Sequence, residues 1–306
     1  MNRLGYLAVA AAAVLWAVGG TYAQTLFARG ASPIELTEAR AWIAAAGMGI
    51  IALVRGPDRA RRDGPRRSPL LLVPFGLSIA AANASYYLAL SLLPVAVAIV
   101  VQYSAPALVV LWKSAGARKT PSGRVALALL LTFAGVVLVS RLHEALGGRT
   151  DLSYFGVAIA LVSAVAFGLY ILLGEAIGAA LAPERALLYG FSVAGVFWVG
   201  VQVVRGRPET LLDPQFAWPI LFLGVFTTIV PFLLFIWGLG IVRASVAGIV
   251  STLEPVGAAL LAFVWLGQAL DGFQILGAAA VIVGVAVVQT ERPPLPEVLV
   301  ERAAVE

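Results

Sequence analysis

Residues 244–266 read ASVAGIVSTLEPVGAALLAFVWL, an apolar run that contains a single carboxylate. As a helix it would span about 34 Å at 1.5 Å per residue, slightly more than the hydrocarbon core of a bilayer. Glu254 would lie near mid-depth, where a charge costs on the order of 3 kcal/mol and usually faces other helices or a water-filled cavity. Helical spacing places Ala247, Ser251, Glu254 and Ala258 on one face. The run therefore predicts a membrane helix with one face on a polar cavity.

The composition of the whole chain indicates an integral membrane protein. Of its 306 residues 61% are hydrophobic and 12% are charged, and the mean hydropathy is +0.95, far above the values of soluble domains. The absence of cysteine excludes disulfides, thiolate metal ligands and a cysteine nucleophile. The single histidine, His143, falls in a predicted loop, and we expect neither a metal site nor a cofactor. The net charge of +5 comes from arginines in loops beside apolar runs, so no nucleic-acid partner is expected.

Ten apolar segments of membrane-spanning length follow one another along the chain. They cover residues 5–27, 35–54, 69–90, 95–113, 122–140, 153–174, 184–204, 216–239, 244–266 and 271–290. The predicted fold is all-α, with ten transmembrane helices in the lipid bilayer. The first segment has some features of a signal peptide, but its apolar part is too long for one, and we expect a retained helix. A tail of residues 291–306, rich in Pro and Glu, is expected to be disordered.

The basic residues predict an orientation in the membrane. Short cytoplasmic loops carry an excess of Lys and Arg. Two loops of the chain do so, with Arg55, Arg59, Arg61, Arg62, Arg66 and Arg67 in one and Lys113, Arg118, Lys119 and Arg124 in the other. We therefore expect these loops and both chain termini in the cytoplasm, and the protein in the inner membrane of a bacterial cell.

The two halves of the chain resemble each other at a shift of about 150 residues. The aligned positions are Pro33 with Pro183, Arg55 with Arg205, Pro106 with Pro255 and Gly135 with Gly284. Each half holds five spans, and because five is odd the second half must be inverted. We expect residues 1–143 and 144–290 to form two inverted five-helix repeats. Transporters built in this way place their substrate site near the midplane, between the repeats.

Polar and aromatic side chains fall near the centres of the spans. Pro106, Pro231 and Pro255 each lack the N–H that would bond the carbonyl four residues earlier, so we expect them to loosen their helices. The candidate substrate-binding residues are Trp16, Ser78, Asn83, Tyr86, Tyr87, Gln102, Tyr103, Tyr170, Thr227, Thr228, Ser251, Thr252 and Glu254. Carboxylates and carbonyls can receive an ammonium group, while hydroxyls and amides can donate to a carboxylate. Each aromatic taken alone is better explained by helix packing or an interfacial belt.

Several short motifs carry a resemblance to a known family. In the first half they are Tyr86-Tyr87-Leu88-Ala89-Leu90, Pro94-Val95-Ala96-Val97-Ala98 and Pro106; in the second half they are Leu253-Glu254-Pro255, Leu266-Gly267-Gln268, and Gly277 with Gly284. With these motifs the chain resembles the EamA family of the drug/metabolite transporter superfamily, and Arg40 looks like the family's arginine in the second span. The resemblance implies ten helices in two inverted repeats and export of amino acids, other metabolites or toxic compounds. Gln268 stands where the family often has Glu, so a role of that acid cannot be carried over.

We therefore expect a secondary transporter that exports small metabolites, in the first place amino acids, aromatic or other apolar ones included, by alternating access. The alternatives are a multidrug exporter of the same fold and a membrane scaffold that transports nothing. The chain carries no motif of an intramembrane enzyme. Glu254 either exchanges a proton and couples transport to it, or bonds a backbone group or Arg40 and only holds helices together. The coupling ion, the direction of net flux and the choice between monomer and homodimer stay open.

Overall fold

The chain folds into a bundle of long apolar helices. The computed structural model describes residues 2–56, 69–93, 95–147, 153–178, 181–206, 208–267 and 269–290, and within these residues every regular element is helical. Nine helical segments of this part are long and apolar enough to cross a membrane, and a tenth apolar helix, Gly123–Val139, has 17 residues. The predicted all-α membrane fold is confirmed. The predictions that lie outside the described residues concern the tail 291–306, the arginines from Arg59 to Arg67, Pro94 and Gln268.

Ten spans can be followed in order through the two halves. The first half contains α1 (Asn2–Phe27), α2 (Pro33–Arg55), η1 (Pro69–Leu71) with α3 (Leu72–Leu92), α4 (Val95–Gln102) with α5 (Ala105–Ala117), and α6 (Gly123–Val139). The second half contains α8 (Tyr154–Gly178), α9 (Pro183–Arg205), α11 (Pro214–Gly224) with η2 (Val225–Ile229) and α12 (Val230–Leu239), α13 (Ala244–Ser251) with α14 (Leu253–Leu266), and α15 (Gly272–Gln289). The short helices α7 (Leu142–Gly147) and α10 (Glu209–Leu212) lie in the connections.

Local sequence signals explain where several helices begin and end. Ser32 caps α2 by accepting from the backbone N–H of Glu35, the third residue of the helix, and α15 starts with a capping box between Asp271 and Gln274. Gly56 and Gly206 follow α2 and α9 with φ of 69° and 88°. Glycine takes this left-handed backbone without a steric penalty. The two glycines align in the sequence, so equivalent helices of the two halves end in the same way.

Two equivalent spans are interrupted near their centres. α4 ends at Gln102 and α5 starts at Ala105, while α13 ends at Ser251 and α14 starts at Leu253. A proline follows each interruption closely and removes a backbone donor. The eighth span contains the π-helical turn η2 directly before α12. Irregular backbone of this kind inside a membrane is tolerated where it is buried in protein or lines a cavity.

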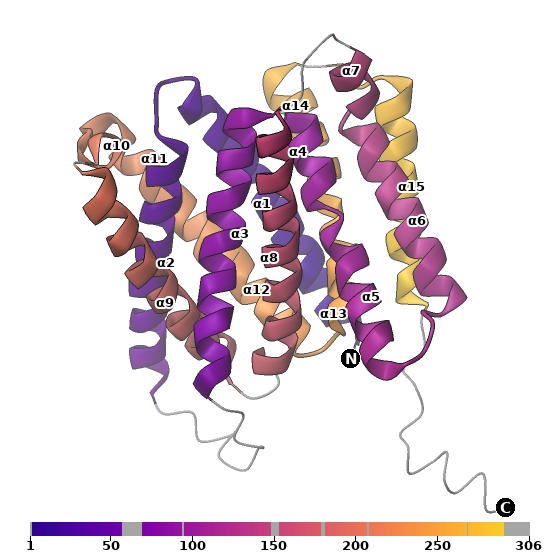
Figure 1. The fold of residues 1–306 in the computed structure, drawn as a ribbon, viewed down its shortest axis with the longest axis horizontal. Coiled ribbons are helices and arrows are strands. Elements are labelled where there is room, and N and C mark those ends of the chain that lie inside the picture. Colours follow the sequence, from indigo (N-terminus) through magenta and orange to yellow (C-terminus); the bar gives the residue numbers. More distant parts are fainter. Residues whose placement is uncertain are drawn as a thin grey trace, which may run out of the picture.

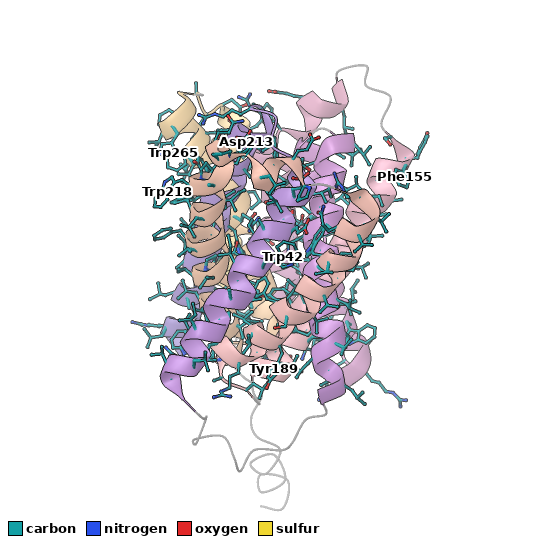
Figure 2. The ribbon with its side chains drawn as sticks, turned by 90° about the vertical axis from the view of Figure 1, so that its left-hand side faces the viewer. Trp42, Phe155, Tyr189, Asp213, Trp218 and Trp265 are labelled. Carbon is teal, nitrogen blue, oxygen red and sulfur yellow. The ribbon has the colours of Figure 1, made fainter. Side chains whose placement is uncertain are left out.

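Helix packing follows the relation between the halves. The contact of α3 with α8 has its equivalent in the contact of α12 with α1. In the same way, the contact of α1 with α14 has its equivalent in the contact of α8 with α4 and α5. α2 packs on its own equivalent α9, and α6 packs on its own equivalent α15. α1 begins at the lower edge of Figure 1, whereas Phe155, near the start of α8, lies at the upper end in Figure 2, and Tyr189 of α9 lies at the lower end. The two halves therefore run in opposite directions and pack about a pseudo-two-fold relation.

Candidate substrate-binding site

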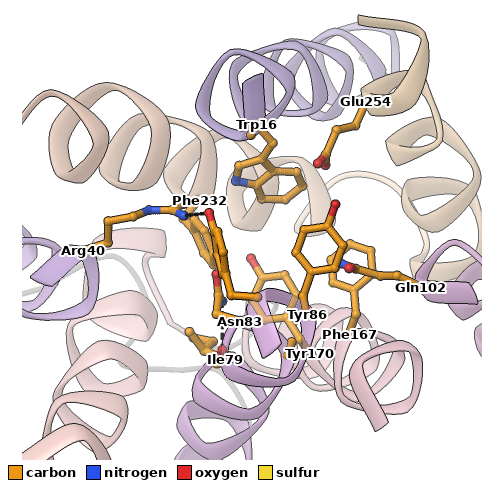
Figure 3. A pocket seen from close by; sticks show the side chains of 13 residues that line it. Trp16, Arg40, Ile79, Asn83, Tyr86, Gln102, Phe167, Tyr170, Phe232 and Glu254 are labelled. Carbon is orange, nitrogen blue, oxygen red and sulfur yellow. Dashed lines mark hydrogen bonds between the residues drawn. The ribbon is translucent and has the colours of Figure 1, made fainter. Parts of the chain in front are cut away.

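A pocket lies among the helices, and both halves contribute to its walls. Its lining comes from α1, α2, α3, α4, α8, α12 and α14, and consists of Trp16, Gly20, Arg40, Ile79, Ala82, Asn83, Tyr86, Tyr87, Gln102, Phe167, Tyr170, Phe232 and Glu254 (Figure 3). The volume of the cavity that is open to the centre of a water molecule is about 80 Å³. The pocket is therefore narrow, and a polar group inside it contacts protein on several sides.

Glu254 supplies the acid of the pocket. It belongs to the first turn of α14, where the positive end of the helix dipole favours a negative charge. Its Oε2 accepts a hydrogen bond of 2.6 Å from the hydroxyl of Tyr103, which lies in the turn between α4 and α5. A hydrogen bond to a charged acceptor is about twice as strong as one between neutral groups. The carboxylate is thus held at the pocket by a residue of the other half.

Arg40 supplies the base of the pocket and is held by three hydrogen bonds. Its Nε donates to Thr228 Oγ1 at 2.8 Å, its Nη1 to the hydroxyl of Tyr87 at 2.6 Å, and its Nη2 to the carbonyl of Thr227 at 3.3 Å. The Thr227 carbonyl is available because Pro231, four residues later, has no N–H to donate. Arg40 is buried, and among the described residues it makes no ion pair. The guanidinium is therefore fixed in place, and no described carboxylate contacts it directly.

Two polar side-chain atoms at the pocket have no hydrogen-bond partner in the part of the chain that the structure describes. They are Oε1 of Gln102 and the hydroxyl of Tyr170, and both are buried. Buried polar groups are rarely left unpaired, so each such atom calls for a partner such as water or a ligand. Both residues line the pocket, while these two atoms are themselves buried in the wall.

Aromatic rings form much of the remaining wall of the pocket. Trp16 contacts Phe232 and Phe167 edge to face, with ring centroids 5.4 and 6.3 Å apart, and Tyr170 stacks on Phe167 at 6.1 Å. Such pairs stabilise the packing of α1, α8 and α12 beyond the burial of their surface. The rings pack the helices together and also line the pocket. The interpretation of these aromatic residues as packing residues and the prediction that they line a substrate site are therefore compatible.

The structure brings most of the predicted residues together. Those that line the pocket are Trp16, Asn83, Tyr86, Tyr87, Gln102, Tyr170 and Glu254. Tyr103, Thr227 and Thr228 stand behind this lining, because they hydrogen-bond Glu254 and Arg40. Among the described residues the hydrogen bond to the Glu254 carboxylate comes from Tyr103, a partner that neither interpretation of Glu254 from the sequence named.

Three predicted hydroxyls are not brought to the pocket. Ser78, Ser251 and Thr252 donate to backbone carbonyls one turn earlier in their own spans, at 2.7, 2.7 and 2.6 Å. Hydroxyls on helices readily bond a carbonyl of their own helix in this way, so a position on the polar face of a helix does not decide which partner the hydroxyl bonds.

The sequence did not predict Gly20, Ile79, Ala82 and Phe232, which line the pocket but have no polar side chain. Arg40 could be found as the one arginine inside an apolar span.

Comparison with known proteins agrees with this architecture. The model of the EamA-like transporter family matches residues 3–141 and 154–290, one match in each half. The chain belongs to the EamA-like transporter family. The resemblance seen in the motifs is thereby confirmed, and the protein is a multi-pass membrane protein of a transporter family.

Curated relatives and a solved structure add to the family match. The threonine/homoserine exporter RhtA of Salmonella typhimurium (strain SL1344) is 30% identical over 230 residues, which cover 74% of this chain and 72% of the exporter. The exporter of the same name from Escherichia coli (strain K12) is 26% identical over 230 residues, with the same coverage. An uncharacterized transporter of Archaeoglobus fulgidus is 28% identical over 137 residues, 45% of this chain and 48% of its own length. A crystal structure of a protein with 22% identity has a TM-score of 0.75 and covers 96% of this chain and 100% of its own, which supports the fold.

Proposed function

We propose that this EamA-like transporter exports small zwitterionic amino acids across the inner membrane by alternating access. One observation carries the proposal: a fixed arginine and a carboxylate face the same narrow pocket from different sides (Figure 3). The substrate carboxylate binds at Arg40, and the substrate ammonium group binds at Glu254. A zwitterion cannot enter hydrocarbon without partners for both of its charges, and this pocket offers one partner for each.

Arg40 is suited to bind the carboxylate. A guanidinium has five N–H donors in a planar fork that matches a carboxylate. Three of the five are engaged by Tyr87, Thr227 and Thr228 within the described part of the chain. These contacts fix the orientation of the fork before substrate arrives, so little side-chain entropy is lost on binding.

The size and polarity of the pocket favour short side chains. A cavity of about 80 Å³ suits a small amino acid better than a large one. Gln102 Oε1 and the Tyr170 hydroxyl have no partner among the described residues, and a substrate hydroxyl can bond one of them once the helices move and expose it. The relatives named threonine/homoserine exporters point to hydroxylated amino acids of this size. The aromatic wall supports aromatic amino acids as the second candidate class.

Glu254 links substrate to protons in this proposal. A carboxylate that binds an ammonium group must be ionised. Once the carboxylate has taken up a proton, it no longer attracts the ammonium group. Proton and substrate therefore compete for Glu254, and export of one substrate is exchanged for entry of a proton. The helix-loosening Pro106, Pro231 and Pro255 belong to the spans that move between the two states.

The test is efflux of radiolabelled compounds from proteoliposomes that contain the full chain. The panel holds threonine, homoserine, phenylalanine, tryptophan and a cationic dye. We expect efflux of one or more amino acids, its loss in Arg40→Gln, and a flattened pH dependence in Glu254→Gln. Arg29→Gln, an exposed arginine in the loop before α2, is the matched control and should transport normally. Movement of the dye alone would favour the multidrug exporter, and movement of no compound would favour the scaffold; either result overturns the proposal.

A further inference from the structure

A groove on the surface of the bundle lies between α5 of the first half and α8 of the second. Its lining includes Trp112, Lys113, Leu169, Leu172, Leu173 and Glu175. A volume of about 440 Å³ in this groove is open to the centre of a water molecule. The groove shares no lining residue with the central pocket, so the substrate site does not explain it.

The two ends of the groove differ in polarity. Lys113 and Glu175 lie in the last turns of α5 and α8, where a membrane span reaches the headgroup region. Leu172 and Leu169 lie one and two turns deeper along α8. Trp112 is 68% exposed, and tryptophan is enriched at the depth of the headgroups. The groove therefore runs from a charged end at the membrane surface to an apolar end within the hydrocarbon.

The charged end holds one cation and one anion. Lys113 and Glu175 form an ion pair, and 45% and 22% of their side chains are exposed. The ammonium group of Lys113 has three N–H donors, of which Glu175 takes one among the described residues. Glu175 also accepts from the backbone N–H of Ala244 at 2.8 Å, at the start of α13. Its carboxylate is thus held in place, and it has lone pairs for further donors.

The packing of the repeat does not require the lysine. Pro106 aligns with Pro255, so Lys113 aligns with Ala262 in the second half. Ala262 belongs to α14, which packs against α1 as α5 packs against α8. An alanine is therefore sufficient at this position of the fold, and the charge of Lys113 calls for another explanation.

We propose that this groove binds a phospholipid with a primary ammonium in its headgroup, phosphatidylethanolamine. The lipid phosphate accepts from the remaining N–H groups of Lys113, the lipid ammonium donates to Glu175, and one acyl chain lies along Leu172 and Leu169. The paired charges of the groove complement a zwitterionic headgroup, whereas an anionic headgroup without an ammonium group is repelled by Glu175. The site is independent of the proposed transport of amino acids and goes beyond it.

The lipid probes are the dioleoyl forms of phosphatidylethanolamine, phosphatidylcholine and phosphatidylglycerol. Each is added to the full chain in detergent, and native mass spectrometry measures the fraction of protein that carries a lipid. Phosphatidylethanolamine should bind with an apparent dissociation constant about fivefold or more below that of phosphatidylcholine, whose ammonium has no N–H to donate to Glu175. Phosphatidylglycerol, which has no ammonium group, should also bind more weakly than phosphatidylethanolamine.

Substitutions of lysine test the charged end. Lys113→Gln removes the partner of the phosphate and should raise the dissociation constant of phosphatidylethanolamine by about fivefold or more. Lys113→Arg keeps a cation at this place and should retain most of the affinity. Lys119→Gln, which changes an exposed lysine outside the groove, is the matched control and should bind as the unchanged protein does.

Substitutions of leucine test the apolar end. Leu172→Trp fills the groove without changing a charge and should weaken the binding of all three lipids. Leu77→Trp fills another groove, between α3 and α9, whose described lining residues are all uncharged; it is the matched control and should leave binding unchanged. Thermal unfolding of each variant in detergent separates loss of the lipid from loss of the fold.

Three results overturn the proposal. The first is equal binding of phosphatidylethanolamine and phosphatidylcholine by the unchanged protein. The second is tighter binding of phosphatidylglycerol, which would make the groove a site for anionic lipids. The third is unchanged affinity for phosphatidylethanolamine in folded Lys113→Gln or Leu172→Trp. Efflux of amino acids is measured separately, so none of these results bears on the proposed function.

Discussion

The hydroxyl of Tyr103 donates a 2.6 Å hydrogen bond to the carboxylate of Glu254. Tyr103 lies in the turn that separates α4 from α5, and Glu254 lies directly after the turn that separates α13 from α14. One bond thus joins the two interrupted spans, one from each half, at the edge of the pocket. A substrate ammonium group that binds Glu254 must compete with Tyr103, so substrate binding and the coupling of the two spans are linked.

Tyr103→Phe should shift the pH dependence of efflux. The substitution keeps the buried ring and removes the hydroxyl, and a hydrogen bond to a charged group contributes about 1.5–3 kcal/mol. Without it the ionised form of Glu254 is less stable, and the midpoint of the pH profile should rise by about one to two units. Efflux from proteoliposomes at a series of pH values measures this. Tyr189→Phe, the same change at an exposed tyrosine, is the control, and equal profiles for the two variants would contradict the assignment.

Arg40→Lys should weaken binding of substrates that carry a carboxylate. Lysine keeps the charge but loses the planar fork and the three hydrogen bonds that orient it. We expect the dissociation constant of the amino-acid substrate to rise by roughly tenfold or more, which is about 1.4 kcal/mol. The matching amine without a carboxylate should bind the variant and the unchanged protein alike. Calorimetry in detergent measures both, and an equal loss for the two ligands would indicate a purely structural role.

Gly135→Ala should destabilise the contact between α6 and α15. A Cβ at Gly135 would lie 2.6 Å from the carbonyl oxygen of Gly277 and 2.9 Å from the backbone nitrogen of Val281, neither of which can move aside easily. Overpacking of this kind costs about 1–3 kcal/mol. Thermal unfolding in detergent should show a lower Tm for Gly135→Ala, while Gly116→Ala, where an added Cβ meets nothing within 4 Å, should leave Tm close to its original value. A small decrease of the same size in both would reject close packing as the cause.

The sequence predicts the spans well because a bilayer leaves the chain little choice: every backbone group must be bonded within a helix, and the apolar length is fixed. The inversion follows from an odd number of spans in each half, and the helices confirm it. The use of individual polar groups is harder to predict. The Thr227 carbonyl, expected to be open to substrate, accepts from Arg40, and the Ser251 hydroxyl turns to its own helix. These outcomes depend on rotamers and on neighbours almost 190 residues away in sequence, which no local pattern contains.

Asp271 should make the stability of the bundle depend on pH in the acidic range. It caps α15, where its Oδ1 accepts from the backbone N–H of Gln274 at 2.8 Å, and its Oδ2 forms an ion pair of 2.8 Å with Arg141. The backbone hydrogen bond first, and then the Arg141 guanidinium, hold the pKa of this carboxyl below its usual range. A lowered pKa in the folded state means that the stabilisation is fully present above the ordinary Asp pKa of about 4, and is lost as the pH falls through the folded value.

Asp271→Asn separates the charge from the cap, because Asn caps a helix about as well as Asp. The variant should have a lower Tm than the unchanged protein at neutral pH, and the difference should shrink as the pH falls below about 4 and Asp271 in the unchanged protein takes up its proton. Thermal unfolding in detergent across this range measures both proteins, with Glu209→Gln as an exposed control. A difference in Tm that stays constant with pH would mean that the Arg141 pair contributes nothing and that Asp271 acts through the shape of the cap alone.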